Sequence, residues 1–100
     1  MTFTDYQAAM RRTYKPSRLM NHILGLCGEA GEVAEMIKKS TYHDRDYLNE
    51  QMKDELGDVL WYLTALAEDH ELGLDEIAHH NVEKLRARYP DGFQTGGGIR

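Results

Sequence analysis

The fold is decided by one uninterrupted stretch, Ser17-Arg-Leu-Met-Asn-His-Ile-Leu-Gly-Leu-Cys-Gly-Glu-Ala-Gly-Glu-Val-Ala-Glu-Met-Ile-Lys-Lys-Ser-Thr41. Apolar residues recur along it at the three- and four-residue spacing of an amphipathic helix. They are Leu19, Ile23, Leu26, Cys27, Ala30, Val33, Ala34 and Ile37. Serine is a favoured N-cap residue, and Ser17 directly follows Pro16. We therefore predict a long helix over residues 17–41, capped by Ser17, with these residues as its buried stripe.

A second long helix is predicted after the polar turn 42–46. It runs from about Tyr47 to His70, and we expect Gly73 to stop it. One side carries Leu48, Met52, Val59, Leu63 and Leu66. The two stretches together predict an antiparallel helical hairpin.

Two shorter helices flank this hairpin. The first is expected to start at Thr4, whose hydroxyl can cap it together with Gln7 three residues on, and to end before Pro16. The last is expected to be capped by Asp75 and to reach about Arg88. No stretch alternates polar and apolar residues long enough for a strand. The predicted fold class is all-α, with pairs of hairpins forming a four-helix bundle on oligomerisation.

Length and composition limit the function classes. A chain of 100 residues fits one domain, which we place at residues 1–90, followed by a flexible glycine-rich tail at 91–100. The 12 basic and 17 acidic residues give a net charge of −5, which argues against general nucleic-acid binding. No apolar run approaches the roughly 20 residues that cross a bilayer. With a single cysteine, Cys27, and no secretion signal, the expected location is the cytoplasm.

Two acidic motifs carry the chemistry, Glu29-Ala-Gly-Glu32 and Glu55-Leu-Gly-Asp58. Residues three apart are neighbours on a helix surface, so each motif presents two carboxylates side by side. A glycine precedes the second acid in both motifs, at a cost of about 1 kcal/mol relative to alanine. Close approach of another backbone or of a ligand is the usual reason for such a glycine.

The spacing of the motifs places all four acids together. If the hairpin turns between His43 and Asp44, residues equally far from that point in the sequence lie opposite each other along the hairpin axis. Glu29 and Asp58 form one such pair, and Glu32 and Glu55 form another, because both pairs have their midpoint at position 43.5. At about 100° per residue, Glu55 falls within the apolar stripe of its helix and Asp58 lies on the flank. Facing carboxylates repel one another unless a cation joins them, and oxygen ligands of this kind suit Mg²⁺. We therefore predict a Mg²⁺ site, with Mn²⁺ as an alternative ion.

The same residues have two other interpretations. The acids could form a solvated face paired with Lys38, Lys39 and Lys53, as most Glu-x-x-Glu patterns do. A transition-metal site could use His70, His79 or His80, but paired-iron bundles need Glu-x-x-His on two helices, and here only Glu76-Ile-Ala-His79 has that pattern. The Mg²⁺ site is favoured because the paired acids are equally far from the turn and because Glu55 falls within the apolar stripe of its helix.

Three stretches resemble the MazG-like all-α nucleoside triphosphate pyrophosphohydrolases, in the small single-domain form found in bacteriophages and bacteria. They are Leu24-Gly-Leu-Cys-Gly-Glu-Ala-Gly-Glu-Val-Ala-Glu-Met-Ile-Lys-Lys39, Asp54-Glu-Leu-Gly-Asp-Val-Leu-Trp-Tyr-Leu63 and Asn81-Val-Glu-Lys-Leu-Arg-Ala-Arg88. Many members open the first motif with two glutamates, whereas here Gly28 precedes Glu29. That departure leaves open how many ions bind.

The resemblance implies cleavage of a nucleoside triphosphate between its α and β phosphates, with Mg²⁺ held by Glu29, Glu32, Glu55 and Asp58. Glu32 or Glu35 could act as general base, and the choice between them stays open. Lys84 and Arg88 lie one helical turn apart, and Asn81 lies one turn before Lys84. We expect these three residues and Lys38 to contact the phosphates of the substrate. Trp61 is three residues beyond Asp58 and could stack on the base, although core and interface roles are common for tryptophan.

The resemblance also implies a homodimer or homotetramer, located in the host cytoplasm if the protein is phage-encoded. A purine deoxynucleotide such as dGTP is the first choice of substrate, and the glycine-rich tail could fold over it. The rival hypothesis is a non-catalytic helical interaction module whose acids bind a structural ion. No nucleic-acid or membrane partner is expected.

Overall fold

A computed structural model describes residues 1–42 and 46–92 of the chain. Within these ranges the secondary structure is entirely α-helical, which confirms the predicted fold class. The helices are α1 (Phe3–Met10), α2 (Leu19–Tyr42), α3 (Asn49–Asp69) and α4 (Leu74–Arg88). The centre of the predicted turn and the tail beyond residue 92 lie outside the described residues.

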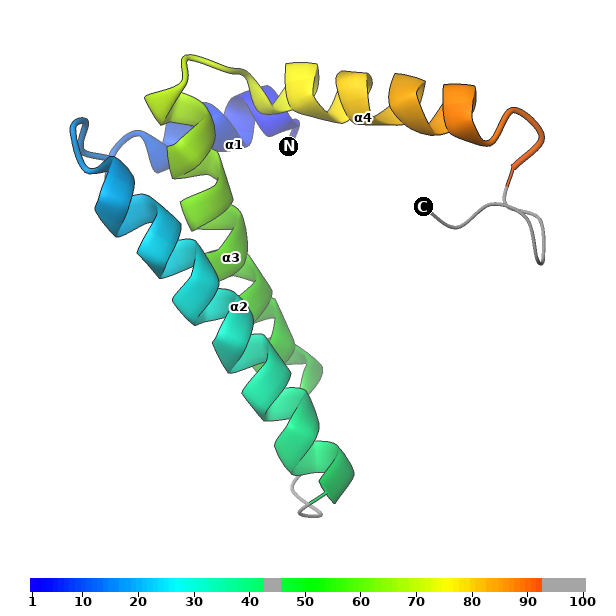
Figure 1. Cartoon of the computed structure of the whole chain (residues 1–100). Coiled ribbons are helices and arrows are strands. Elements are labelled where there is room, and N and C mark those ends of the chain that lie inside the picture. The colour runs from blue at the N-terminus through cyan, green and yellow to red at the C-terminus, as the bar shows by residue number, and fades with distance from the viewer. Residues whose placement is uncertain (43–45, 93–100) are drawn as a thin grey trace.

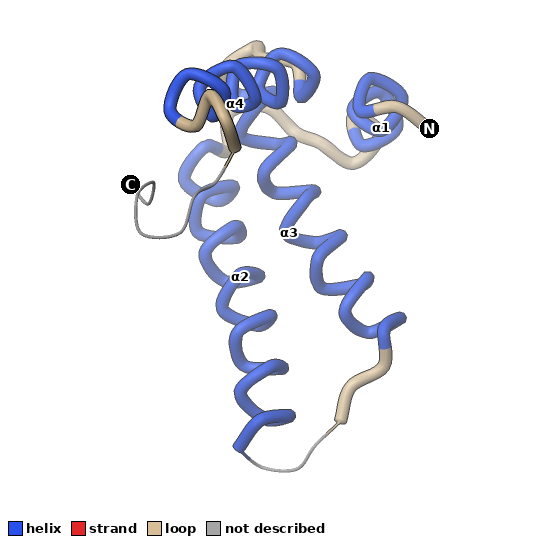
Figure 2. Tube along the Cα trace, turned by 90° about the vertical axis from the view of Figure 1, so that its right-hand side faces the viewer, coloured by secondary structure: helices blue, strands red, loops and turns tan. Residues whose placement is uncertain are grey.

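The helices α2 and α3 pack along each other as an antiparallel hairpin, and α1 and α4 lie at the end where α2 begins (Figures 1 and 2). From there α4 projects sideways, away from the hairpin (Figure 1). Buried Gln7 joins the elements at this end. Its side-chain amide donates to the Leu72 carbonyl at 2.9 Å, and its oxygen accepts from the backbone N–H of Leu74 at 2.8 Å. One side chain of α1 therefore fixes the loop from which α4 starts.

The predicted cap of the first helix is wrong. Thr2 caps α1: its hydroxyl accepts from the Asp5 backbone N–H and the Asp5 carboxylate accepts from the Thr2 N–H, both at 3.0 Å. This reciprocal pair satisfies two N–H groups at the helix start, which the predicted pair of Thr4 and Gln7 does not do. The Thr4 hydroxyl instead donates to the Asp75 carboxylate at 2.7 Å and ties α1 to α4.

Three further helix boundaries differ from the prediction. Ser17 has φ 63°, whereas an N-cap residue needs an extended backbone for its hydroxyl to reach the next turn, and α2 begins only at Leu19. Gly73 does not stop α3, which ends at Asp69; it is the N-cap of α4, and its N–H donates to Glu76 at 2.8 Å. Asp75 consequently lies in the first turn of α4 rather than at its cap.

Burial is concentrated at the end of the hairpin near α1. Among the described residues the buried side chains are Gln7, Met10, His22, Thr64, Ala65, Ala67 and Leu74. The predicted apolar stripe of α2 is not buried in the single chain, since Leu19 is 51% and Ile37 44% exposed. One partner helix covers only part of a stripe this wide. No helix in the described ranges has the length and apolarity of a membrane span.

Gly25 is required where α2 meets α3, because a Cβ atom there would overlap the ring of Tyr62. We expect Gly25→Ala to lower the free energy of unfolding by about 1–3 kcal/mol, as overpacking does in cores. Denaturant unfolding of the purified protein measures this loss. Gly57→Ala is the matched control on α3, since a Cβ atom at Gly57 meets nothing within 4 Å. Equal destabilisation by the two substitutions would contradict the close-approach argument.

Candidate functional site

The hairpin gathers three carboxylates at one level. Glu29 and Glu32 from α2 and Glu55 from α3 each offer an oxygen atom, and these atoms lie within 4.8 Å of one another. Glu29 and Glu55 are half-buried, whereas Glu32 is exposed. We call these three residues the acidic cluster. Its position on two facing helices follows the mirrored spacing of the two motifs.

Asp58, the fourth predicted ligand, lies beside the acidic cluster and not within it. It is exposed, as expected from the flank of α3, and it lines a hollow of about 310 Å³ together with Glu29. The other walls of this hollow, which we call the acidic hollow, are Thr13, Trp61 and Tyr62. The acidic cluster therefore borders a space large enough for a ligand.

Electrostatics within the acidic cluster favour a bound cation. One oxygen atom of Glu29 and one of Glu55 are shielded from solvent and have no hydrogen-bond partner among the described residues. Burial, followed by the nearby charge of Glu32, raises the pKa of both carboxyl groups. Buried oxygens that lack a donor and resist ionisation are a suitable donor set for a hard divalent cation, which favours the ionised form. The residues present therefore fit a metal ion.

Two of the three lysines of the solvated-face interpretation, Lys38 and Lys53, have other contacts. Lys53 pairs with Glu50 at 2.9 Å, and Lys38 lies 4.0 Å from Glu35, both on the helix surface. The acidic cluster thus has neither lysine as a counterion. Glu35, one of the two predicted general bases, is exposed beside Lys38 and outside the cluster, whereas Glu32 belongs to it.

The predicted phosphate contacts on α4 are not brought to the acidic cluster within one chain. Asn81, Lys84 and Arg88 are exposed on the helix that projects from the hairpin (Figure 1). That helix contacts α1 and has no comparable contact with α2 or α3. Phosphate binding by these three residues remains a prediction.

Trp61 is held beside the acidic cluster. Its indole N–H donates to the Thr13 hydroxyl at 2.9 Å, and its ring lies edge-on to that of Tyr62 with a centroid separation of 5.1 Å. The placement next to Asp58 agrees with the spacing argument, and base stacking remains a prediction. Thr13 and Tyr62 were missed as lining residues, because neither belongs to the two acidic motifs.

A buried polar network lies under the start of α2, and sequence reasoning missed it. The Asp69 carboxylate accepts from the Tyr14 hydroxyl and contacts Nδ1 of His22, each at 2.7 Å. The side chains of His22 and Asp69 are only 4% and 7% exposed. Burial opposes ionisation of Asp69, but the hydrogen bonds from His22 and Tyr14 outweigh it and lower its pKa. A histidine among the apolar residues of a long helix was the available signal.

Fold and site together define an all-α protein that presents carboxylates from two facing helices to a hollow beside them. The chain belongs to the MazG nucleotide pyrophosphohydrolase domain family, whose sequence profile matches residues 18–93. The gene 37 protein of Mycobacterium phage L5 is 35% identical over 79 residues, covering 75% of this chain and 69% of the phage protein. The crystal structure of iMazG from Vibrio DAT 722 superposes with a TM-score of 0.69 at 27% identity, covering 89% of this chain and 98% of that one.

Proposed function

We propose that this protein is a Mg²⁺-dependent (d)NTP pyrophosphohydrolase, which converts a nucleoside triphosphate and water into the monophosphate and pyrophosphate. The observation that carries the proposal is the pair of shielded, unpartnered oxygens of Glu29 and Glu55 beside Glu32. Family membership supports the reaction class. Together they favour an active site over a merely acidic surface.

In the proposed mechanism Glu29, Glu32 and Glu55 would hold the ion, with Asp58 at the edge of the acidic hollow. When bound there, Mg²⁺ would supply charge neutralisation for the phosphates and help to orient them for in-line attack. The oxygen of a water molecule forms a bond to the α-phosphorus, and the bond from that phosphorus to the α–β bridging oxygen breaks. Pyrophosphate leaves with the bridging oxygen and its electron pair. Glu32, the exposed member of the acidic cluster, accepts the proton of the attacking water.

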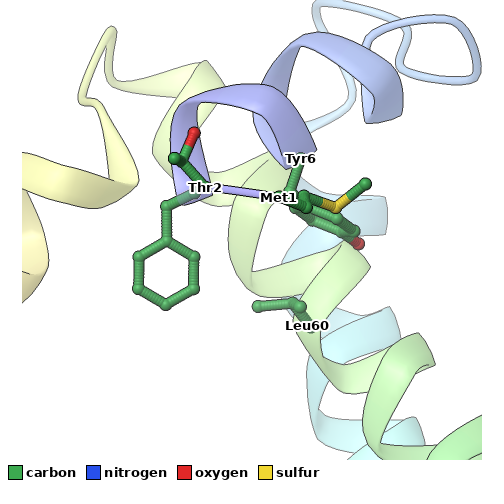
Figure 3. Close-up of a pocket in the computed structure, with 5 residues that line it drawn as sticks. Met1, Thr2, Tyr6 and Leu60 are labelled. Atoms are coloured by element: carbon green, nitrogen blue, oxygen red, sulfur yellow. The ribbon is translucent and has the colours of Figure 1, made fainter.

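We also propose that the protein works as a homodimer or homotetramer. Large apolar side chains are exposed along both long helices, among them Met20 at 66%, Leu24 at 63% and Leu56 at 51%. An apolar hollow of about 370 Å³ adds to this surface between α1 and Leu60 of α3; its other walls are Met1, Thr2, Phe3 and Tyr6 (Figure 3). A second copy that covered these faces would complete a four-helix bundle and could bring a second α4 toward the acidic cluster.

A substrate panel tests the proposed function. Pyrophosphate release is measured from the common ribo- and deoxynucleoside triphosphates, with dGTP as the first substrate, in Mg²⁺, in Mn²⁺ and in a chelator. We expect metal-dependent release of one pyrophosphate per monophosphate from at least one nucleotide. If every nucleotide stays intact while Mg²⁺ still raises the melting temperature, the protein is instead the interaction module with a structural ion.

A further inference from the structure

A second hollow adjoins the acidic one at the start of α2. Its volume is about 200 Å³, and it is lined by Lys15, Arg18, Asn21 and His22. Its remaining walls are Thr13, Trp61 and Tyr62, which it shares with the acidic hollow. We call it the basic hollow. Because the two hollows have three lining residues in common, one ligand can reach from the carboxylates to the cations.

The two cations of the basic hollow have no counterion among the residues that the structure describes. Neither Lys15 nor Arg18 forms an ion pair with a residue in the ranges 1–42 and 46–92, although the chain carries a net charge of −5. Some other surface cations do have partners, such as Arg11 with Glu68 at 2.8 Å. Two adjacent, uncompensated cations that line a concave space favour an anionic ligand.

Thr13 and Trp61, two of the shared lining residues, have few hydrogen-bonding groups left for a ligand. The Thr13 hydroxyl donates to the Met10 carbonyl at 3.0 Å and accepts from the indole N–H of Trp61, which is the only donor of that ring. In His22, Nδ1 is occupied by Asp69, which leaves Nε2. The lining groups without a hydrogen bond among the described residues are therefore Lys15, Arg18, Asn21, Nε2 of His22 and the Tyr62 hydroxyl, and Lys15 and Arg18 supply the positive charge.

We propose that Lys15 and Arg18 bind the β and γ phosphates of the substrate and hold the pyrophosphate product, an inference that rests on the proposed function. With the α-phosphate at the acidic cluster, the rest of the triphosphate carries most of the charge and needs cations. Within one chain α4, which carries the predicted cations, projects away from the hairpin (Figure 1), whereas Lys15 and Arg18 line a hollow that shares three walls with the acidic hollow. The same two residues stabilise the charge that develops on the leaving group when the α–β bond breaks.

Product binding tests this proposal without turnover. Inorganic pyrophosphate and a nucleoside monophosphate are titrated separately into the full-length protein in Mg²⁺ buffer by calorimetry. We expect Lys15→Met and Arg18→Gln each to weaken pyrophosphate binding about tenfold, the loss expected for one charged contact. Monophosphate binding should change by less than about twofold. Arg18→Lys, which retains the charge, should recover most of the affinity.

Arg12→Gln is the matched control, because Arg12 is an exposed cation of the same segment that lines neither hollow. Unchanged pyrophosphate affinity in the Lys15 and Arg18 variants would overturn the proposal, and so would a selective loss of monophosphate binding, which would assign the basic hollow to the nucleoside. An equal loss in Arg12→Gln would point to general charge attraction and overturn it too. If the wild-type panel releases no pyrophosphate, the proposed function itself fails, and that result is independent of the comparison between variants.

Discussion

Glu55→Gln is expected to reduce pyrophosphate release by at least about a hundredfold at saturating Mg²⁺, on the scale of losing a principal electrostatic contact to the reacting phosphate. Glu55 is half-buried in the acidic cluster, and one of its oxygens has no partner among the described residues. Glutamine keeps the size of the side chain but replaces one anionic oxygen with an amide that repels a cation. The measurement is steady-state pyrophosphate release with the best nucleotide of the panel, over a range of Mg²⁺ concentrations.

The same substitution should have the opposite effect on stability without metal. Burial and the charge of Glu32 raise the pKa of Glu55, so ionising this carboxyl group costs more free energy in the folded protein than in the unfolded chain. Removing that charge should raise the melting temperature in chelator and shrink the further rise that Mg²⁺ produces. Greater metal-free stability with lost activity would be the signature of a site that exists to hold an ion.

Glu50→Gln is the control for both measurements. Glu50 is an exposed glutamate of the same helix, five residues away and paired with Lys53. We expect it to keep wild-type activity and melting behaviour within experimental error. If Glu55→Gln retained full turnover, the acidic cluster would not be the catalytic centre.

The hairpin and its acidic cluster could be predicted because both follow from periodicity. The apolar spacing identifies two long helices. In an antiparallel pair, residues equally far from the turn in sequence lie opposite each other along the hairpin axis. That is why Glu29, Glu32 and Glu55 meet without any tertiary information. The helical wheel also placed Glu55 inward and Asp58 outward, as the structure has them.

Features set by single tertiary contacts could not be predicted. The direction of α4 depends on hydrogen bonds from Gln7 and Thr4, 65 to 71 residues away in sequence. Secondary-structure propensity depends on neighbouring residues and does not predict hydrogen bonds between residues so far apart in sequence. The basic hollow was missed for a related reason, since Lys15 precedes α2 in a segment without periodicity. Helix caps were misassigned by two residues at Thr4 and Asp75, because several polar residues near each start could cap it.

Asp69→Asn is expected to lower the free energy of unfolding by about 3 kcal/mol, the range for breaking a buried charged hydrogen-bond pair. Asp69 accepts from two side chains at once, and an asparagine oxygen can satisfy only part of that demand without the charge. Urea unfolding at fixed protein concentration measures the loss. Asp46→Asn, an exposed substitution of the same kind, should cost almost nothing.

The effect of Asp69→Asn should depend on pH in a defined direction. The pKa of Asp69 is lower in the folded protein than its ordinary value of 3.8, so ionised Asp69 stabilises the fold above about pH 4. That contribution is lost as the pH falls through the lower folded-state pKa. The stability difference between wild type and Asp69→Asn should therefore shrink as the pH falls below about 4. A difference that grew in acid would contradict the stabilising role assigned to ionised Asp69.

Tyr14 reports on the same network from the alkaline side. Its hydrogen bond to Asp69, then burial and the charge of that carboxylate, raise its pKa from 10.0 to about 12. A raised pKa means that the contribution of this hydrogen bond to folding stability is complete below pH 10 and is lost as the pH rises to about 12.

In Asp69→Asn the pKa of Tyr14 should return toward 10, because the group that disfavours the tyrosinate has lost its charge. The ultraviolet absorbance of tyrosinate, compared with and without Tyr14→Phe, isolates this one residue. An alkaline titration of Tyr14 that does not respond to Asp69→Asn would show that the two side chains are not coupled in solution.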